Sequence, residues 1–271
     1  MKKILLTLGF VGITLGPAQA ALIFSDNFNA PDTNNLDLSD QTGRRSGLDS
    51  AIQVRSSRVQ HGIVSGQLDF LSAGTGRVRF HNDPDNSSAT AGSWHDWATG
   101  PGASSILADG GIRVQFEWIA GNNTSQNWVA FNIGHSPESV PEPAFRVNEA
   151  SNDLGILFRF SGATQTFKNG IDAAANGTFP ATLGSRNVTI DYRFNSFADG
   201  SNVNVNASLN GTNAYTGAFQ WNGNGGALFM ELETLENTRI NSFSVSSIPE
   251  PSAPVLAALC AGTMVLRRRR R

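Results

Sequence analysis

Three glutamates near the C-terminal end of the chain have a spacing that could support acid–base chemistry. They stand at Glu231, Glu233 and Glu236 in the stretch ELETLE. Residues i and i+2 of a β-strand project from the same face. A retaining glycosidase needs two carboxyl groups about 5–5.5 Å apart, one as acid and one as nucleophile. The spacing therefore makes glycoside hydrolysis one hypothesis for this chain.

The neighbours of these glutamates favour a structural interpretation. Leu228, Met230 and Leu232 alternate with Glu231 and Glu233, as in a strand with one buried and one solvated face. We therefore predict no catalytic residues and keep a polysaccharide-active enzyme as the alternative hypothesis.

Two tryptophans are candidates for ligand binding. Trp94 and Trp97 stand in GSWHDWATG, beside His95 and Asp96, within a long irregular stretch. An exposed aromatic ring offers a flat apolar face to a sugar ring, and polar neighbours can bind its hydroxyl groups. These two tryptophans are the predicted glycan-binding residues. The alternative is that both rings are packing anchors beneath the loop, because tryptophan is highly buried on average.

Acidic and amide side chains could also supply oxygen ligands to calcium, which takes roughly six to eight of them from flexible loops. The candidate ligands fall in two runs, Asp26, Asp32, Asn34 and Asp37, and then Asp83 and Asp85. Neither run has EF-hand spacing, and turn-forming residues explain both. We therefore predict no metal and no other cofactor, and leave calcium open as the alternative.

The elements that must position these residues are β-strands. In IRVQFEWIAG, residues 112–121, apolar and polar residues alternate with the two-residue period of a half-buried strand. The alternation recurs in residues 187–194 and 202–211, and no helical stripe of comparable length occurs. The pattern predicts an all-β protein, an antiparallel β-sandwich with one polar and one buried face per sheet.

Asn-Gly pairs mark the expected hairpin turns, because both residues tolerate the positive φ that tight turns require. The pairs begin at Asn169, Asn176, Asn210 and Asn222.

Composition excludes one class of partner and one means of stabilisation. Charged residues make up 15% of the chain and the net charge is -2, whereas roughly 25% is typical. No basic patch indicates nucleic-acid binding. The single cysteine, Cys260, lies in the apolar run near the C-terminus, so the fold must be stabilised by its hydrophobic core.

The N-terminal segment has the three parts of a secretory signal peptide. Lys2 and Lys3 precede an apolar run from Ile4 to Leu15, and Ala18-Gln19-Ala20 supplies a small-x-small cleavage pattern. We expect this segment to form a helix that engages the Sec translocon, with cleavage between Ala20 and Ala21.

The C-terminal segment also has three parts in a fixed order. Pro249, Glu250 and Pro251 come first, an apolar run follows from Ala253 to Leu266, and five arginines end the chain. The run is shorter than the ~20 residues of a comfortable membrane span. The arginines would stay cytoplasmic under the positive-inside rule. The two prolines hold the triplet extended, as a protease groove requires.

This order of parts resembles the PEP-CTERM sorting signal of Gram-negative bacteria. The resemblance implies that a short hydrophobic helix holds the protein transiently in the inner membrane. It implies that an exosortase-type membrane protease then cuts at the Pro249-Glu250-Pro251 triplet. It further implies a link with exopolysaccharide. The residues that would form the membrane stop are Arg267, Arg268, Arg269, Arg270 and Arg271.

Two alternatives to the sorting signal stay open. The C-terminal segment could be a tail anchor that is retained in the membrane, or a basic tail with no processing role.

The remainder of the chain resembles concanavalin A-like, laminin-G-type jelly rolls. The resemblance lies in FSDNFNAPDTNNLDLSD near the start and MELETLENTRINSFSVSS near the end. It implies that the first and last strands pair in one sheet. ELETLE is also similar to the E-x-D-x-x-E signature of laminarinase-like glycosidases, but Glu233 replaces the aspartate and the strand is nearly the last one.

These inferences give three segments: a signal peptide at 1–20, a β-sandwich ectodomain at 21–247 and a sorting segment at 248–271. The leading hypothesis is a non-enzymatic exported protein that is released to the cell surface or extracellular matrix. There it would act as a structural or glycan-associated component. A protein–protein adhesion module is a third hypothesis, and it predicts an exposed apolar patch on one sheet.

Overall fold

The computed structural model describes residues 20–32, 43–50, 52–57, 61–70, 75–81, 94–120, 127–135, 147–178, 184–222, 227–235 and 238–248. The expected signal helix and C-terminal hydrophobic helix lie outside these residues. The described residues belong to one compact unit that spans Ala20–Ile248. Within this part of the chain, no helix has the length and apolarity needed to cross a membrane.

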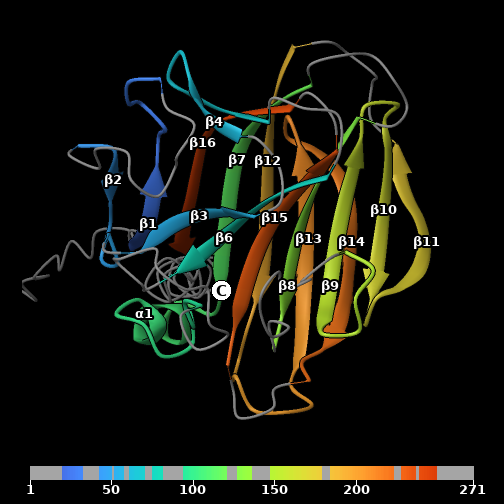
Figure 1. The fold of residues 1–271 in the computed structure, drawn as a ribbon. Helices are drawn as coiled ribbons and strands as arrows, with labels where there is room; N and C mark the ends of the chain where they lie inside the picture. The colour runs from blue at the N-terminus through green and yellow to red at the C-terminus, as the bar shows by residue number, and fades with distance from the viewer. Residues whose placement is uncertain are drawn as a thin grey trace, which may run out of the picture. The chain divides into compact units, whose positions relative to one another are not determined.

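Nine strands form one antiparallel sheet: β1 (Leu22–Asp26), β2 (Arg45–Ser46), β4 (His61–Val64), β5 (Gln67–Phe70), β7 (Ile112–Ala120), β12 (Gly184–Arg193), β13 (Asn202–Leu209), β14 (Thr212–Gln220) and β16 (Thr238–Ser247). Their spatial order is β14-β13-β12-β7-β16-β1-β2, and β5 pairs with both β16 and β4. Figure 1 shows β7, β12 and β16 running alongside one another in this sheet.

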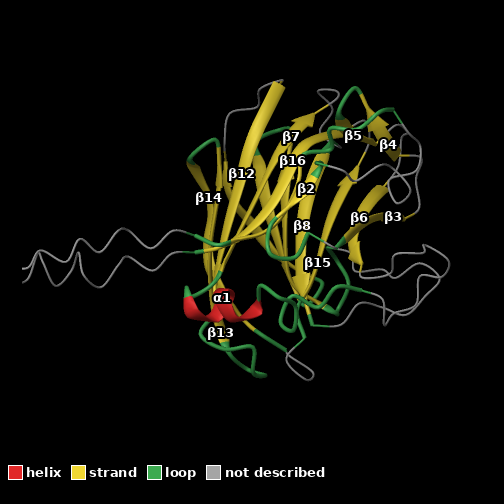
Figure 2. Ribbon diagram, turned by 90° about the vertical axis from the view of Figure 1, so that its left-hand side faces the viewer, coloured by secondary structure: helices red, strands yellow, loops and turns green. Residues whose placement is uncertain are grey.

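Seven strands form the second antiparallel sheet: β3 (Gln53–Ser57), β6 (Thr75–His81), β8 (Trp128–Gly134), β9 (Asn152–Arg159), β10 (Ala163–Lys168), β11 (Ile171–Thr178) and β15 (Phe229–Leu235). Their order is β11-β10-β9-β8-β15-β6-β3. Figure 2 shows β14 and β12 of the first sheet on one side of the molecule and β6 and β3 of the second sheet on the other. The predicted all-β antiparallel sandwich is confirmed.

The core lies between the two sheets and follows the alternation in the sequence. Val114 and Phe116 on β7 are buried, whereas Gln115 between them is exposed. From the opposite sheet, the ring of Phe131 on β8 stacks against Phe116 with centroids 6.4 Å apart, and against Phe243 on β16 at 6.1 Å. Aromatic rings from both sheets thus interdigitate to hold the layers together.

Two of the predicted Asn-Gly hairpins are confirmed. Asn169 and Gly170 have φ of 50° and 73°, and Asn210 and Gly211 have 49° and 77°, as the mirror-image turn of a two-residue hairpin requires. The turn predicted at Asn176 is wrong, because this residue lies within β11. The short helix α1 (Ala103–Ala108) was not predicted, because six residues are too few to show a helical stripe.

The two ends of the compact unit meet in the nine-stranded sheet. β1 pairs antiparallel with β16, with Leu22 opposite Ser246. The Ala21 amide donates to Ser247 Oγ at 2.8 Å, and the Ser247 amide donates to the Ala21 carbonyl at 2.9 Å. The expectation that the first and last strands pair is confirmed.

Replacing Phe131 tests whether the two sheets share one packed core. Phe131→Ala removes a fully buried ring and leaves a cavity, so the free energy of unfolding should fall by about 3–5 kcal/mol in urea titrations. Asn204→Ala, at an exposed position of β13, should change it by less than about 0.5 kcal/mol. A loss below about 1 kcal/mol for Phe131→Ala would contradict this packing.

Candidate functional site

Glu231 and Glu233 lie on the face of the seven-stranded sheet opposite the sheet–sheet core. Their neighbours Met230 and Leu232 belong to that core. Both glutamates are nevertheless buried, with 0% and 3% of their surface exposed. The predicted solvated face is therefore wrong at this strand. Alternation identified the two faces of β15 correctly, but it could not show that the outer face is covered. Glu236 lies outside the described residues.

Two arginines on the adjacent strand β6 pair with these glutamates and form the glutamate–arginine cluster, Arg77, Arg79, Glu231 and Glu233. Strand register places Glu231 opposite Arg79 and Glu233 opposite Arg77. Arg79 Nε lies 3.5 Å from Glu231 Oε2. Arg77 Nε lies 4.0 Å from Glu231 Oε1 and 3.9 Å from Glu233 Oε1. Two carboxyl groups therefore face two guanidinium groups.

Residues outside β6 and β15 also bind to this cluster. The Val147 amide donates to Glu233 Oε2 at 3.0 Å, and Asn132 Nδ2 donates to the same oxygen at 3.4 Å. The guanidinium of Arg79 lies 5.1 Å from the ring centroid of Trp94, within the range of a cation–π contact. The cluster thus fixes Val147 and Trp94, which lie outside the two strands that form it.

The electrostatics of the cluster do not favour the glycosidase hypothesis. Burial raises the pKa of Glu231 well above 4.5, the charge of Glu233 raises it further, and Arg79 and Arg77 oppose the shift. A raised pKa suits a general acid, but such an acid must reach its substrate. Glu231 is fully buried, and its neighbour Glu233 accepts hydrogen bonds from Val147 and Asn132. The cluster is built to neutralise charge within the protein.

The predicted glycan-binding tryptophans are buried, so the expected exposed rings are wrong. Trp94 and Trp97 expose 3% and 1% of their surfaces. Trp97 packs edge-on against Phe80 at 5.5 Å and Phe24 at 6.2 Å. Trp94 packs edge-on against Phe229 at 6.5 Å. Both rings are packing anchors, because apolar and cationic partners cover the faces that a sugar would need.

A histidine and an aspartate are buried beside Trp97. The ring of His95 packs edge-on against Trp97 at 4.6 Å, and His95 Nε2 lies 3.2 Å from Asp49 Oδ2. Burial lowers the pKa of His95 from 6.5 to about 4, opposed by the carboxylate of Asp96. Burial also raises the pKa of Asp49. His95 is therefore a neutral imidazole near pH 7.

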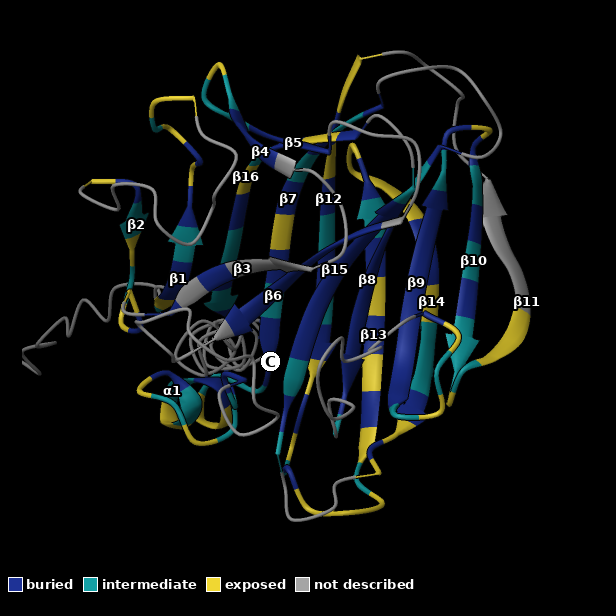
Figure 3. Cartoon of the chain, viewed as in Figure 1, coloured by how far each residue is buried: buried dark blue, intermediate teal, exposed yellow. Residues whose placement is uncertain are grey.

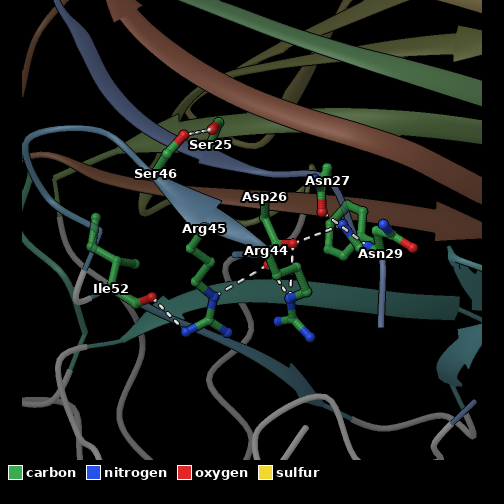
Figure 4. A network of polar contacts seen from close by, with 9 residues as sticks. Ser25, Asp26, Asn27, Asn29, Arg44, Arg45, Ser46 and Ile52 are labelled. Carbon is green, nitrogen blue, oxygen red and sulfur yellow. Dashed lines mark hydrogen bonds and ion pairs between the residues drawn. The ribbon is translucent and has the colours of Figure 1, made fainter. Parts of the chain in front are cut away.

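The carboxylate of Asp26, the first candidate calcium ligand, forms ion pairs with two arginines. Its carboxylate lies 2.9 Å from Arg44 Nε and 3.3 Å from Arg45 Nε, and it accepts a hydrogen bond from the Phe28 amide at 2.8 Å. Figure 4 shows contacts from the Nε atoms of Arg44 and Arg45 to this carboxylate, and a terminal nitrogen of Arg45 directed at the Ile52 carbonyl. Cationic side chains thus take the positions that a calcium ion would need.

The other candidate ligands give no cluster. Asp32 accepts a hydrogen bond from the Ser65 amide at 2.7 Å. Asn34, Asp37, Asp83 and Asp85 lie outside the described residues. Within the described ranges, no three His, Cys, Asp or Glu side chains are grouped to hold a metal ion.

Sequence reasoning missed a polar cluster around Asp153, here called the Asp153 cluster: His135, Asp153, Asn169 and Asn222. Asp153 is buried and accepts from Asn222 Nδ2 at 3.1 Å, and its Oδ1 lies 3.0 Å from His135 Nδ1. Asn222 Nδ2 also donates to Asn169 Oδ1 at 2.8 Å. Asn169 and Asn222 are exposed to solvent. The arrangement can bind a polar ligand by hydrogen bonds, and within the cluster no hydroxyl or thiol supplies a nucleophile.

No linear motif could reveal the Asp153 cluster. Its members come from four separate segments, and both asparagines were identified only as turn residues of Asn-Gly pairs. Burial raises the pKa of Asp153, while the charge and hydrogen bonds of His135 and the hydrogen bonds of Asn222 oppose the shift.

The predicted processing residues stand at or beyond the limits of the described unit. Ala20 and Ala21 are described at its start. The processing triplet, Pro249, Glu250 and Pro251, lies outside the described residues. So do all five arginines of the predicted membrane stop, which are Arg267, Arg268, Arg269, Arg270 and Arg271. The sorting signal therefore stays a prediction.

Comparisons with known proteins find similar structures only. No protein-family model and no curated protein matches the sequence. The potassium-bound carbohydrate recognition domain of Emp46p is 8% identical, with a TM-score of 0.46, over 83% of this chain and 99% of that one. The Ca²⁺/Man3GlcNAc-bound exoplasmic/lumenal domain of VIP36 is 12% identical, with a TM-score of 0.43, over 77% and 88%.

Lectin II from Ulex europaeus is 11% identical, with a TM-score of 0.41, over 73% of this chain and 93% of that chain. These neighbours are carbohydrate-binding domains by description. Identities of 8 to 12% and TM-scores below 0.5 assign no ligand to the present chain.

A double-mutant cycle tests the glutamate–arginine cluster. Arg79→Gln leaves the Glu231 carboxyl group buried without its nearest cation. Glu231→Gln leaves the Arg79 guanidinium buried without the carboxylate that it faces. Each change should lower the free energy of unfolding by about 3 kcal/mol. The double variant should lose at least about 1 kcal/mol less than the sum. Arg239→Gln, at a half-exposed pair with Asp69, should cost under about 1 kcal/mol. Additive losses would show that Arg79 and Glu231 do not interact.

The lowered pKa of His95 predicts a specific loss of stability in acid. The unfolded state binds the proton near pH 6.5 and the folded state only near pH 4, so stability falls as the pH drops through this window. Between about pH 7.5 and 4.5, the wild type should lose about 2–3 kcal/mol more than His95→Gln, measured by urea unfolding. Equal losses in the two proteins would place His95 in contact with solvent.

Proposed function

We propose that this chain is a non-enzymatic exported bacterial protein whose β-sandwich acts as a structural or glycan-associated component of the cell surface or extracellular matrix. In this proposal the Sec translocon exports it and cleavage after Ala20 removes the signal peptide. The C-terminal segment holds it transiently in the inner membrane. An exosortase-type protease then cuts at Pro249-Glu250-Pro251 and releases it.

One observation carries the proposal: the sandwich closes its own hydrogen bonds between the two proposed cleavage points. Ala21 and Ser247 exchange hydrogen bonds through their backbone and the Ser247 hydroxyl. The next residue, Ile248, is 2% exposed and its amide donates to the Gly111 carbonyl at 3.1 Å. Both cuts would therefore fall outside the paired backbone, so neither would remove a strand from the sheet.

The described chemistry supports a binding or structural role over catalysis. The two described glutamates of ELETLE are paired with arginines inside the protein. The Asp153 cluster instead presents two exposed amides, Asn169 and Asn222, anchored on a buried carboxylate. Amides both donate and accept hydrogen bonds, which suits the hydroxyl groups of a glycan.

Mass spectrometry of the released protein tests the sorting route. In a host with an exosortase, extracellular protein should end near Pro249, because the positive-inside rule would leave the triplet at the outer face of the inner membrane. Replacing Pro249 and Pro251 by alanine should keep the protein with the membrane fraction, uncut, since the resulting Ala-Glu-Ala segment is no longer held extended by proline. Substituting the exposed Ser161 by alanine is the matched control and should not alter release. Extracellular material that retains Arg271 would refute processing.

A further inference from the structure

The outer face of the nine-stranded sheet carries an unbroken row of uncharged polar side chains. Strand register aligns one such residue from each of seven consecutive strands. In spatial order, this polar row is Asn213, Ser208, Thr189, Gln115, Ser244, Ser25 and Ser46. With about 4.8 Å between neighbouring strands, the row is roughly 29 Å long.

The polar row faces solvent. Asn213, Gln115 and Ser46 are exposed, and the other four members are partly exposed. Figure 3 shows exposed and buried segments alternating along β13. The row residues also contact one another: Gln115 Nε2 donates to Thr189 Oγ1 at 3.4 Å, and the hydroxyls of Ser25 and Ser46 lie 2.8 Å apart. A hydroxyl has one donor and two acceptor sites, so capacity remains toward solvent.

Strand stability alone does not explain these residue types. Exposed positions of central strands are well filled by β-branched or aromatic residues, but only Thr189 in the row belongs to either class. Protein surfaces also normally carry charges of both signs, and none occurs in the row. Positions that depart from local structural preference are often kept for function.

Of the two rows beside the polar row, one carries Glu117 between Asn187 and Ser242, and the other is close to neutral. Asp191 and Arg113 stand opposite each other there, and Arg113 donates to both carboxylate oxygens of Asp191, at 2.7 and 2.8 Å. The register continues this row to Asn206 and Thr216 on one side and to Ser246 on the other. The pair neutralises itself, so this row and the polar row together offer hydrogen bonds without net charge.

We propose that the polar row is a docking face for an extended, uncharged polysaccharide chain laid across the strands. The inference rests on the glycan-associated part of the proposed function and names the ligand class. Sugar hydroxyls donate and accept hydrogen bonds, as do the hydroxyls and amides of the row. The strand spacing of about 4.8 Å is comparable with the length of one pyranose unit in an extended chain, so successive sugars meet successive strands. Many weak contacts along one polymer then add up to useful avidity.

Other occupants fit this face less well. An anionic polymer or nucleic acid requires clustered cations, and Arg113 is already paired with Asp191. A protein partner requires aromatic and apolar anchors at the centre of its interface, and the polar row contains none.

Binding of the purified full-length protein to three probes tests the proposal. Microcrystalline cellulose is measured by co-sedimentation, and soluble dextran and anionic alginate by affinity electrophoresis. The wild type should bind at least one neutral glycan and not alginate. Thr189→Val/Ser208→Ala/Ser244→Ala removes three hydroxyls with little change in shape and should weaken binding about tenfold. Gln115→Arg places a bulky charge in the middle of the row and should have a similar effect.

Matched controls separate this inference from the proposed function. Ser104→Ala/Ser161→Ala changes exposed hydroxyls outside the nine-stranded sheet and should bind like the wild type, and thermal unfolding must show that every variant folds. If both row variants bind the glycan as well as the wild type and Asn222→Ala loses binding, the polar row is not the docking face. Glycan association would then remain, at the Asp153 cluster. Binding to alginate alone, or to no probe, would overturn the row and the neutral ligand together. A wild-type dimer that the row variants dissociate would reassign the face to self-association, which also overturns the proposal.

Discussion

The antiparallel pairing of β1 with β16 is the interaction on which the other features of this protein depend. It joins the first and last strands of the compact unit. The pairing brings Phe24 and Phe243 together at 6.3 Å, beside Phe80. β1 in turn pairs with β2, which extends the polar row to Ser46. The same pairing thus closes the core, completes the outer face and brings Ala21 and Ser247 together.

The two sheets differ in the exposure of polar groups on their outer faces: the glutamate–arginine cluster is buried, and the polar row is exposed to solvent. The seven-stranded sheet buries charges in the glutamate–arginine cluster, where desolvation is costly and the arginines offset it. Buried ion pairs of this kind contribute little net stability, but they fix the segments that lie over them, here at Val147 and Trp94. The nine-stranded sheet leaves the uncharged groups of the polar row in water, where they cost little and can exchange solvent for a ligand. Chemistry with an external partner is therefore better placed on the second face.

Much of the fold could be predicted from the sequence because alternation reports directly on which residues face the core. The strands around Phe116, Ile190 and Val205 follow from a period of two, and the positive φ of Asn210 follows from its Asn-Gly pair. The candidate site was harder to predict, because the sequence alternates in the same way whether water or another chain segment covers the polar face of a strand. Glu231 and Trp94 are buried by segments distant in sequence, and the polar row exists only once the register of seven strands is known.

We infer that the sandwich is complete between the two proposed cuts, and the stability of the fragment between them checks this claim. Residues 21–248 should be produced alone and compared with the full chain by urea unfolding. Because Ala21, Ser247 and Ile248 retain their hydrogen bonds, the two free energies of unfolding should agree within about 0.5 kcal/mol. A fragment that fails to fold, or that is less stable by more than about 2 kcal/mol, would show that a terminal segment is an integral part of the fold and would contradict the claim.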